Sequence, residues 1–275
     1  MKLFMEMFGV RVPVISVIHL LPLPGSPKYS GISVWEIANK AVEEAKAMEK
    51  NGINGLIIEN FGDKLFLKEV GQEVVAAMTY IAKDIKDVVD IPVGLCVLQS
   101  DAIAGVAIAK AGDADVIRIP YYTEVSVVDT GMMESIAASA LRYRKYLGAD
   151  VKFFADVHVK HSYPLAQRPI EYAAEDAYYR GLADAIIITG RKTGGETKVD
   201  DVARVKKYLP EVPLIVGSGV TIETVDNYLP YVDAIIVATG LNKEGKVEGE
   251  PDPIRISKFM EKVESYRKNY KGENK

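Results

Sequence analysis

The stretch PLIVGSGVT at residues 213–221 has the pattern of a buried strand that ends in glycines and leads into a helix. Runs of the same kind, apolar and rich in β-branched residues, recur at regular intervals along the chain. They are Val12–Leu20, Gly55–Asn60, Pro92–Leu98, Val116–Pro120, Lys152–Val159, Ala185–Gly190, Pro213–Gly219 and Ala234–Gly240. Such near-continuous apolar runs are typical of strands that are covered on both faces.

Helical patterns separate these strands. The first is Trp35–Lys50, which Ser33 is placed to cap. The others are Lys68–Val89, Ala102–Lys110, Met132–Leu147, Ile170–Arg180, Val199–Tyr208, Ile222–Tyr228 and Pro253–Tyr270. Eight strands that alternate with eight helices predict an α/β fold with a closed parallel sheet, the (β/α)8 or TIM barrel. No GxGxxG motif follows the first strand, which speaks against a dinucleotide-binding sheet.

We expect residues 1–275 to form a single barrel domain. Residues 1–11 alternate apolar and polar side chains and are interpreted as an N-terminal arm that covers the base of the fold, or that packs on a second copy in a homo-oligomer. Residues 271–275 are expected to be a frayed tail. Gln and Asn are few while Lys, Glu, Ile and Val abound, which hints at a heat-adapted, thermophilic source.

Composition excludes several classes of protein. Of the 275 residues, 48% are hydrophobic and 26% charged, and the formal net charge is −4. A mildly acidic chain without a basic run has no electrostatic footprint for nucleic acid. The single cysteine, Cys96, excludes an internal disulfide and Cys-rich metal sites. No stretch approaches the roughly 18 apolar residues of a transmembrane segment, so we expect a cytoplasmic protein.

The connections between strands and helices differ in length. Links from helix to strand are short, such as Gly112–Asp115 and Pro210–Val212. Links from strand to helix are long and rich in Gly, Pro and Thr, such as Leu21–Ile32 and Leu241–Asp252. In a barrel the long links gather at the carboxyl ends of the strands, where active sites lie.

Glycine-rich turns after the last strands point to an anion. The seventh strand ends in Gly217-Ser218-Gly219 and the eighth in Thr239-Gly240. Glycines let backbone N–H groups approach an anion, and in barrels these two loops form the recurrent phosphate site. The sixth strand adds further candidates, Gly190, Thr193 and Gly194. The alternative is that these glycines only close tight turns.

The fifth strand ends in three ionisable residues at alternate positions. Asp156, His158 and Lys160 would share one face of an extended strand, while Val157 and Val159 would face the helices. Buried ionisable groups are costly unless they are paired or used. A lysine in such surroundings has a lowered pKa and acts as a base or as an imine-forming nucleophile. The alternative is a hydrated strand end.

Other polar side chains fall at the same ends of the strands. His19 lies at the carboxyl end of the first strand and His161 at that of the fifth, with a histidine packed in the core as the alternative for His19. Glu59 is the best remaining carboxylate for proton transfer, with a structural salt bridge as the alternative. Arg118 is placed to pair with Asp156, and Asp101 suits a helix N-cap as well as a ligand.

A divalent metal is the rival to lysine chemistry. Glu59, Asp156 and His158 offer the oxygen and nitrogen ligands that such an ion takes. No other cofactor is expected, and Cys96 lies within an apolar strand.

At these motifs the sequence resembles the BtpA family. The matching stretches are His19–Pro27, Glu59–Asp63, Asp156–Ser162, Thr189-Gly190 with Thr193-Gly194, and Gly217–Thr221. The resemblance spans nearly the whole chain and implies a phosphate-binding barrel. It departs from the family pattern at Gln99-Ser100, Pro120 and Asn242.

Two functions follow as hypotheses. The residues favour an enzyme, an aldolase-like lyase or an isomerase, that acts on a phosphorylated small molecule. The resemblance implies a non-catalytic assembly or stability factor for a membrane complex, peripheral to the membrane, because the family takes its name from photosystem I biogenesis. A metal-dependent hydrolase or lyase is the third alternative.

Overall fold

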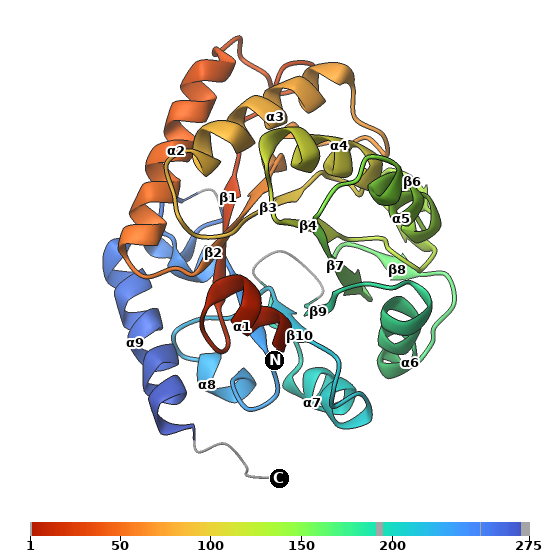
Figure 1. Cartoon of the computed structure of the whole chain (residues 1–275), viewed down its shortest axis with the longest axis vertical. Helices are drawn as coiled ribbons and strands as arrows, with labels where there is room; N and C mark the ends of the chain where they lie inside the picture. The colour runs from red at the N-terminus through yellow and green to blue at the C-terminus, as the bar shows by residue number, and fades with distance from the viewer. Residues whose placement is uncertain (1, 191–194, 248, 271–275) are drawn as a thin grey trace.

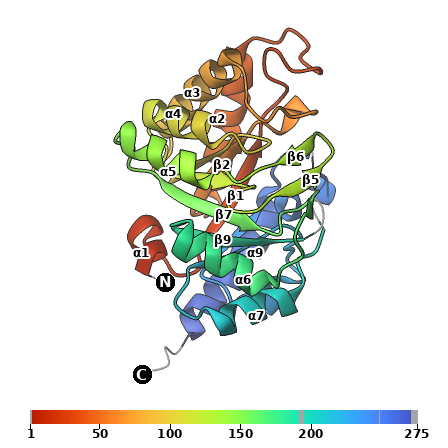
Figure 2. The ribbon, with the colours of Figure 1, turned by 90° about the vertical axis from the view of Figure 1, so that its right-hand side faces the viewer.

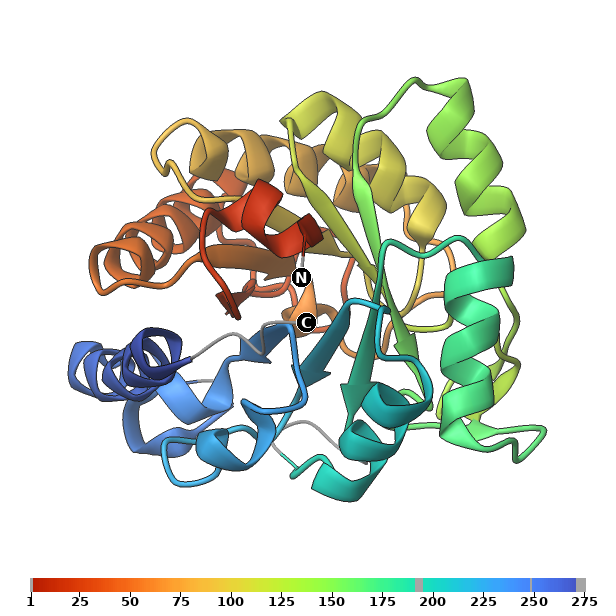
Figure 3. The same ribbon diagram turned by 60° about the horizontal axis from the view of Figure 1, so that its bottom comes forward.

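A closed ring of parallel strands forms the centre of the computed structural model, which describes residues 2–190, 195–247 and 249–270. Within these residues, eight strands pair in the order β1-β11-β10-β9-β7-β4-β3-β2. They are β1 (Val14–His19), β2 (Gly55–Glu59), β3 (Val93–Cys96), β4 (Val116–Ile119), β7 (Lys152–Val157), β9 (Ala185–Thr189), β10 (Leu214–Gly217) and β11 (Ala234–Val237). The (β/α)8 barrel expected from the sequence is confirmed, and Figures 1 and 3 show its helices around the ring.

The helices follow the predicted order, with changes at their ends. They are α2 (Val34–Lys50), α3 (Gln72–Lys86), α4 (Ala102–Gly112), α5 (Ala137–Tyr146), α6 (Ile170–Glu175), α7 (Val199–Tyr208), α8 (Val225–Tyr228) and α9 (Pro253–Asn269). Ser33 caps α2 in a reciprocal hydrogen-bonded box with Glu36, as expected. The helix predicted at 170–180 changes at Asp176 to one π-helical turn, Asp176–Arg180. No helix among the described residues has the length and apolar character of a membrane span.

A small antiparallel sheet at the barrel mouth is absent from the predicted elements. It consists of β5 (Ser126–Val128), β6 (Gly131–Met133) and β8 (Tyr163–Pro164). The prediction that a helix begins at Met132 is therefore wrong, because residues 131–133 pair with β5 and α5 begins only at Ala137. Figure 2 shows β5 and β6 at one end of the barrel and α1 (Lys2–Phe8) at the other.

The barrel has an apolar interior that α1 closes from below. Alternate strand residues such as Ile15, Ile57 and Phe154 fill the ring, and Phe4 of α1 joins them. The rings of Phe4 and Phe154 are 5.8 Å apart, edge to face. A Cβ at Gly55 would lie 2.5 Å from the ring of Phe8, so a side chain at that position would push α1 away.

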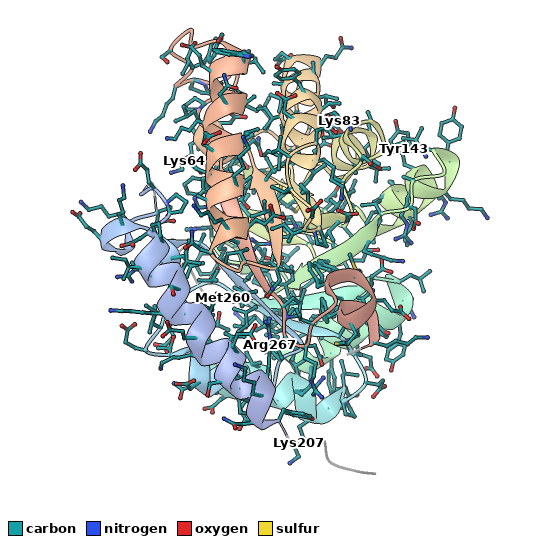
Figure 4. The ribbon with its side chains drawn as sticks, turned by 60° about the vertical axis from the view of Figure 1, so that its left-hand side comes forward. Lys64, Lys83, Tyr143, Lys207, Met260 and Arg267 are labelled. Atoms are coloured by element: carbon teal, nitrogen blue, oxygen red, sulfur yellow. The ribbon has the colours of Figure 1, made fainter. Side chains whose placement is uncertain are left out.

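The amino ends of the strands are held by a contact that repeats four times among the described residues. An Asp or Asn lies directly before every second strand of the barrel. Its side-chain oxygen accepts a hydrogen bond from a backbone N–H near the start of the barrel strand that comes before it in the chain, with N–O distances of 2.8–3.0 Å. A basic side chain from the last turn of a helix contacts the same residue. The four pairs are Asn54 with Arg267, Asp115 with Lys86, Asp184 with Arg144, and Asp233 with Lys206. Figure 4 labels Arg267 near the end of α9, on the side where α1 lies.

Candidate active site

Charged side chains replace apolar ones in the top layer of the barrel interior. Glu59 ends β2, Arg118 lies in β4 and Asp156 in β7, and each is at most 4% exposed. The residues one step away on these strands, such as Ile58, Ile117 and Val157, pack between barrel and helices. The period of two therefore directs the three charges into the carboxyl-end mouth.

Arg118 and Asp156 form a two-pronged ion pair. Nε and Nη2 of Arg118 donate to the two carboxylate oxygens of Asp156 at 3.0 and 2.8 Å. Burial opposes the charge of Arg118, but the neighbouring Asp156 outweighs burial and raises the pKa of the guanidinium. Both oxygens of Asp156 are thus engaged, and this carboxylate holds Arg118 in place.

Glu59 and His19 form a second pair at the mouth. Nε2 of His19 lies 3.5 Å from Oε2 of Glu59, and Nδ1 of His19 lies 3.2 Å from the carbonyl oxygen of Val247. The His19 ring stacks on Phe61 with centroids 4.4 Å apart. Burial alone would raise the pKa of Glu59, but the His19 hydrogen bond and the charge of Lys160 lower it to about 2. Glu59 is therefore a carboxylate at any physiological pH.

Lys160 enters the mouth from a loop and not from a strand. β7 ends at Val157, and His158 has a φ of 47°, which breaks the extended period. The expectation that Asp156, His158 and Lys160 share one strand face is therefore wrong beyond Val157. The backbone N–H of Lys160 donates to Oγ1 of Thr189 at 3.2 Å, which fixes the loop against β9.

The Lys160 amine has surroundings that suit a nucleophile or a base. Within the described residues its Nζ makes no hydrogen bond and no ion pair, although it lines the same cavity as Glu59 and Arg118. Burial and the positive Arg118 lower the pKa of Lys160, and Glu59 and Asp156 offset part of that shift. A lowered pKa leaves more of the amine unprotonated and reactive.

His158 pairs with Glu124 and not with the Lys160 amine. Its backbone N–H donates to Oε2 of Glu124 at 2.9 Å, and its Nε2 lies 3.6 Å from Oε1 of the same carboxylate. Val159 packs on Tyr121 and Met133 beneath the small sheet, not on the helices as expected. Glu124, on the loop after β4, gave no sequence signal, because one glutamate in a polar loop resembles any solvated charge.

The three proposed metal ligands do not converge. Arg118 occupies both oxygens of Asp156, and His158 faces Glu124. Among the described residues no group of three or more His, Cys, Asp or Glu side chains is arranged to hold a metal ion. The expectation of a site from Glu59, Asp156 and His158 is therefore not met. Cys96 lies in the barrel interior, where burial raises the pKa of its thiol.

The loops after β10 and β11 line one wall of the cavity that holds Lys160. Ser218–Thr221 and Ala238–Gly240 surround a space of about 160 Å³ together with Glu59, Arg118 and Lys160. The backbone N–H groups of Gly219 and Val220 make no hydrogen bond within the described residues. Ser218 has a φ of 101°, a strained value that is typical of functional loops. Two such neighbouring donors suit an anion.

Arg255 completes this wall, and sequence reasoning missed it. It lies in the first turn of α9, and its Nε donates to the carbonyl oxygen of Gly240 at 3.0 Å. A positive side chain at the amino end of a helix opposes the helix dipole. That mismatch was the available sign that Arg255 serves another group.

Close packing also explains the glycines of these loops. A Cβ at Gly219 would lie 2.2 Å from the carbonyl oxygen of Gly195, and one at Gly240 would lie 2.5 Å from that of Val220. Gly217 meets Ile187 at 3.0 Å in the same way. The glycines therefore allow close backbone contact between adjacent loops, and they also leave room for an anion.

The remaining candidates lie at different places. Gly190 and His161 line a larger adjoining cleft, and burial beside Lys160 lowers the pKa of His161. Thr193 and Gly194 lie outside the described residues. Asp101 caps α4, accepting from the N–H groups of Ala104 and Val70 at 2.9 Å, and it lines neither cavity. Its role is structural.

Comparisons with known proteins agree with this architecture. Residues 10–265 match the model of the BtpA family. A protein of Archaeoglobus fulgidus is 43% identical over 86% of this chain and 94% of its own. The photosystem I biogenesis protein BtpA of Synechocystis is 38% identical over 95% of this chain and 91% of its own. Phosphoribosyl anthranilate isomerase of Thermus thermophilus aligns with a TM-score of 0.57 over 93% of this chain and 100% of its own, at 12% identity, a likeness of fold alone.

Proposed function

Since the chain belongs to the BtpA family and folds as a TIM barrel, we propose that it is an enzyme that acts on a phosphorylated small molecule. The observation that carries this proposal is the position of the Lys160 amine. It shares one cavity with the N–H groups of Gly219 and Val220 and with the guanidinium of Arg255. A phosphate on these donors would leave the carbon chain of the substrate beside Lys160.

Two reaction classes suit this arrangement. In an aldolase-like lyase, the Lys160 amine attacks a substrate carbonyl carbon and an imine forms with loss of water. In an isomerase, the amine takes a proton from the carbon next to the carbonyl. In either case His19, which lines the same cavity, is the group that carries a proton, Glu59 is the carboxylate 3.5 Å from its Nε2, and Arg118 is the fixed positive charge that faces a developing oxyanion.

Thermal unfolding with phosphate esters tests the anchor. Glycerol 3-phosphate at 100 times its Kd stabilises the fold by about 2.7 kcal/mol, which raises Tm by roughly 5 °C. We expect Arg255→Gln to abolish most of this shift, whereas Lys46→Met, on an exposed helix face, leaves it unchanged. No shift in the wild-type protein at millimolar ester would contradict the proposal. Borohydride added together with a phosphorylated ketone such as dihydroxyacetone phosphate then separates the classes, because it reduces the imine between that carbonyl and Lys160 to a stable amine and does not trap a base.

A second function is favoured by one relative. The Synechocystis protein is named for photosystem I biogenesis, which supports a role as a non-catalytic assembly factor. The two proposals differ in what they require of Lys160. If the protein is an assembly factor, the Lys160→Met variant should still restore function in a complementation assay. If it is an enzyme that uses Lys160, this variant should fail to do so.

A further inference from the structure

Two cavities of different character meet at Lys160. The smaller one, of about 160 Å³, is walled by the loops after β10 and β11. The larger cleft, of about 1480 Å³, extends toward the loops after β2, β4 and β7. Glu59, Arg118 and Lys160 line both, so the two spaces adjoin at these three residues.

The smaller cavity limits what can lie between the anion donors and Lys160. One water takes roughly 30 Å³ of liquid volume, so this cavity of about 160 Å³ has room for about five groups of that size. A phosphate group with a short carbon chain fills it. A larger substrate must therefore pass Lys160 into the adjoining cleft.

The lining of the larger cleft combines polar side chains with apolar and aromatic ones. The apolar and aromatic residues include Leu65, Phe66, Leu98, Tyr121 and Ile170. Leu65 is 64% exposed, although leaving such a side chain in water forgoes the free energy of burial. Exposed apolar side chains that gather at the edge of a catalytic cavity mark a binding surface.

The geometry points to a substrate in two parts: a phosphate monoester whose reacting carbon lies between the phosphate and a ring-sized apolar group. This inference rests on the proposed function and names its substrate class. The phosphate lies on the donors at Gly219 and Val220, the reacting carbon lies beside Lys160, and the apolar group lies between Leu65 and Tyr121. A small phosphorylated sugar would leave this cleft unfilled.

Two probes that differ by one group test the inference. Calorimetry compares the binding of glycerol 3-phosphate with that of its 1-O-benzyl ether. We expect the benzyl ether to bind at least tenfold more tightly, with a more negative heat-capacity change because apolar surface is buried. Leu65→Asp should remove most of that gain and leave the affinity for glycerol 3-phosphate unchanged.

Leu67→Asp is the matched control. Leu67 lies on the same loop and is 61% exposed, but it does not line the cleft. Equal affinity of the wild-type protein for the two probes would overturn the two-part substrate and leave the phosphate anchor intact. The two-part substrate would also be overturned if the Leu65→Asp and Leu67→Asp variants kept the tighter binding of the benzyl ether to the same extent. Failure of both probes to bind would remove the anchor, and both proposals with it.

Discussion

Arg118 decides which carboxylate at the barrel mouth remains available for chemistry. It binds both oxygens of Asp156, whereas its nearest contact to Glu59 is 3.9 Å. Glu59 therefore keeps one oxygen directed toward His19. The strand period predicts that these residues share the mouth. It does not predict which carboxylate pairs with Arg118, because that depends on the conformation of the arginine side chain.

Removing the charge of Asp156 should destabilise the fold. Asp156→Asn leaves Arg118 buried and poorly compensated, which costs about 3–5 kcal/mol in free energy of unfolding. Urea unfolding followed by circular dichroism measures it. Asp226→Asn is the control, because Asp226 pairs with Lys262 on the surface and its loss costs less than about 1 kcal/mol. Equal losses of unfolding free energy in the two variants would show that the buried ion pair stabilises the fold no more than a surface pair does.

The residues that orient His19 could not be predicted from the sequence. His19 is oriented by the carbonyl oxygen of Val247, 228 positions away, and that segment is held by the side chain of Asn242. Neither Val247 nor Asn242 has a chemical type that signals such a role. Lys160 and Glu59 were predictable, since a charge beside an apolar strand is unusual.

Elements with a buried apolar face were predictable, and short paired segments were not. The strands of the barrel were found because both faces are covered, so their apolar runs are nearly unbroken. β5 and β8 hold two or three residues each and pair across 36 or more positions of sequence, from Val127 to Tyr163. Segments this short carry no period, so β5 and β8 fall in predicted loops and β6 falls at the start of a predicted helix.

The helix at the base should contribute strongly to stability. Phe4→Ala removes a ring that is 1% exposed and leaves a cavity in the barrel interior, at a cost of about 3–5 kcal/mol. Met5→Ala, at a neighbouring position that is 42% exposed, should cost well under about 1 kcal/mol. Urea midpoints of the two variants provide the comparison, and similar midpoints would mean that α1 does not close the barrel in solution.

At the scale of the whole molecule, the two ends of the barrel differ in character. At the amino ends of the strands, α1 fills the ring and four Asp or Asn contacts pin the strand starts. At the carboxyl ends, the apolar interior gives way to Glu59, Arg118 and Lys160 beneath the long loops. In TIM-barrel enzymes in general, active sites lie at the carboxyl ends of the strands and the amino ends serve stability.

A crystal structure grown with millimolar glycerol 3-phosphate would show whether an anion binds beside Lys160. We expect density for the phosphate within hydrogen-bond distance of the N–H groups of Gly219 and Val220, with the glycerol carbons directed toward Nζ of Lys160. Density for the ester at any other place, with the space between Val220 and Lys160 holding only water, would contradict this expectation.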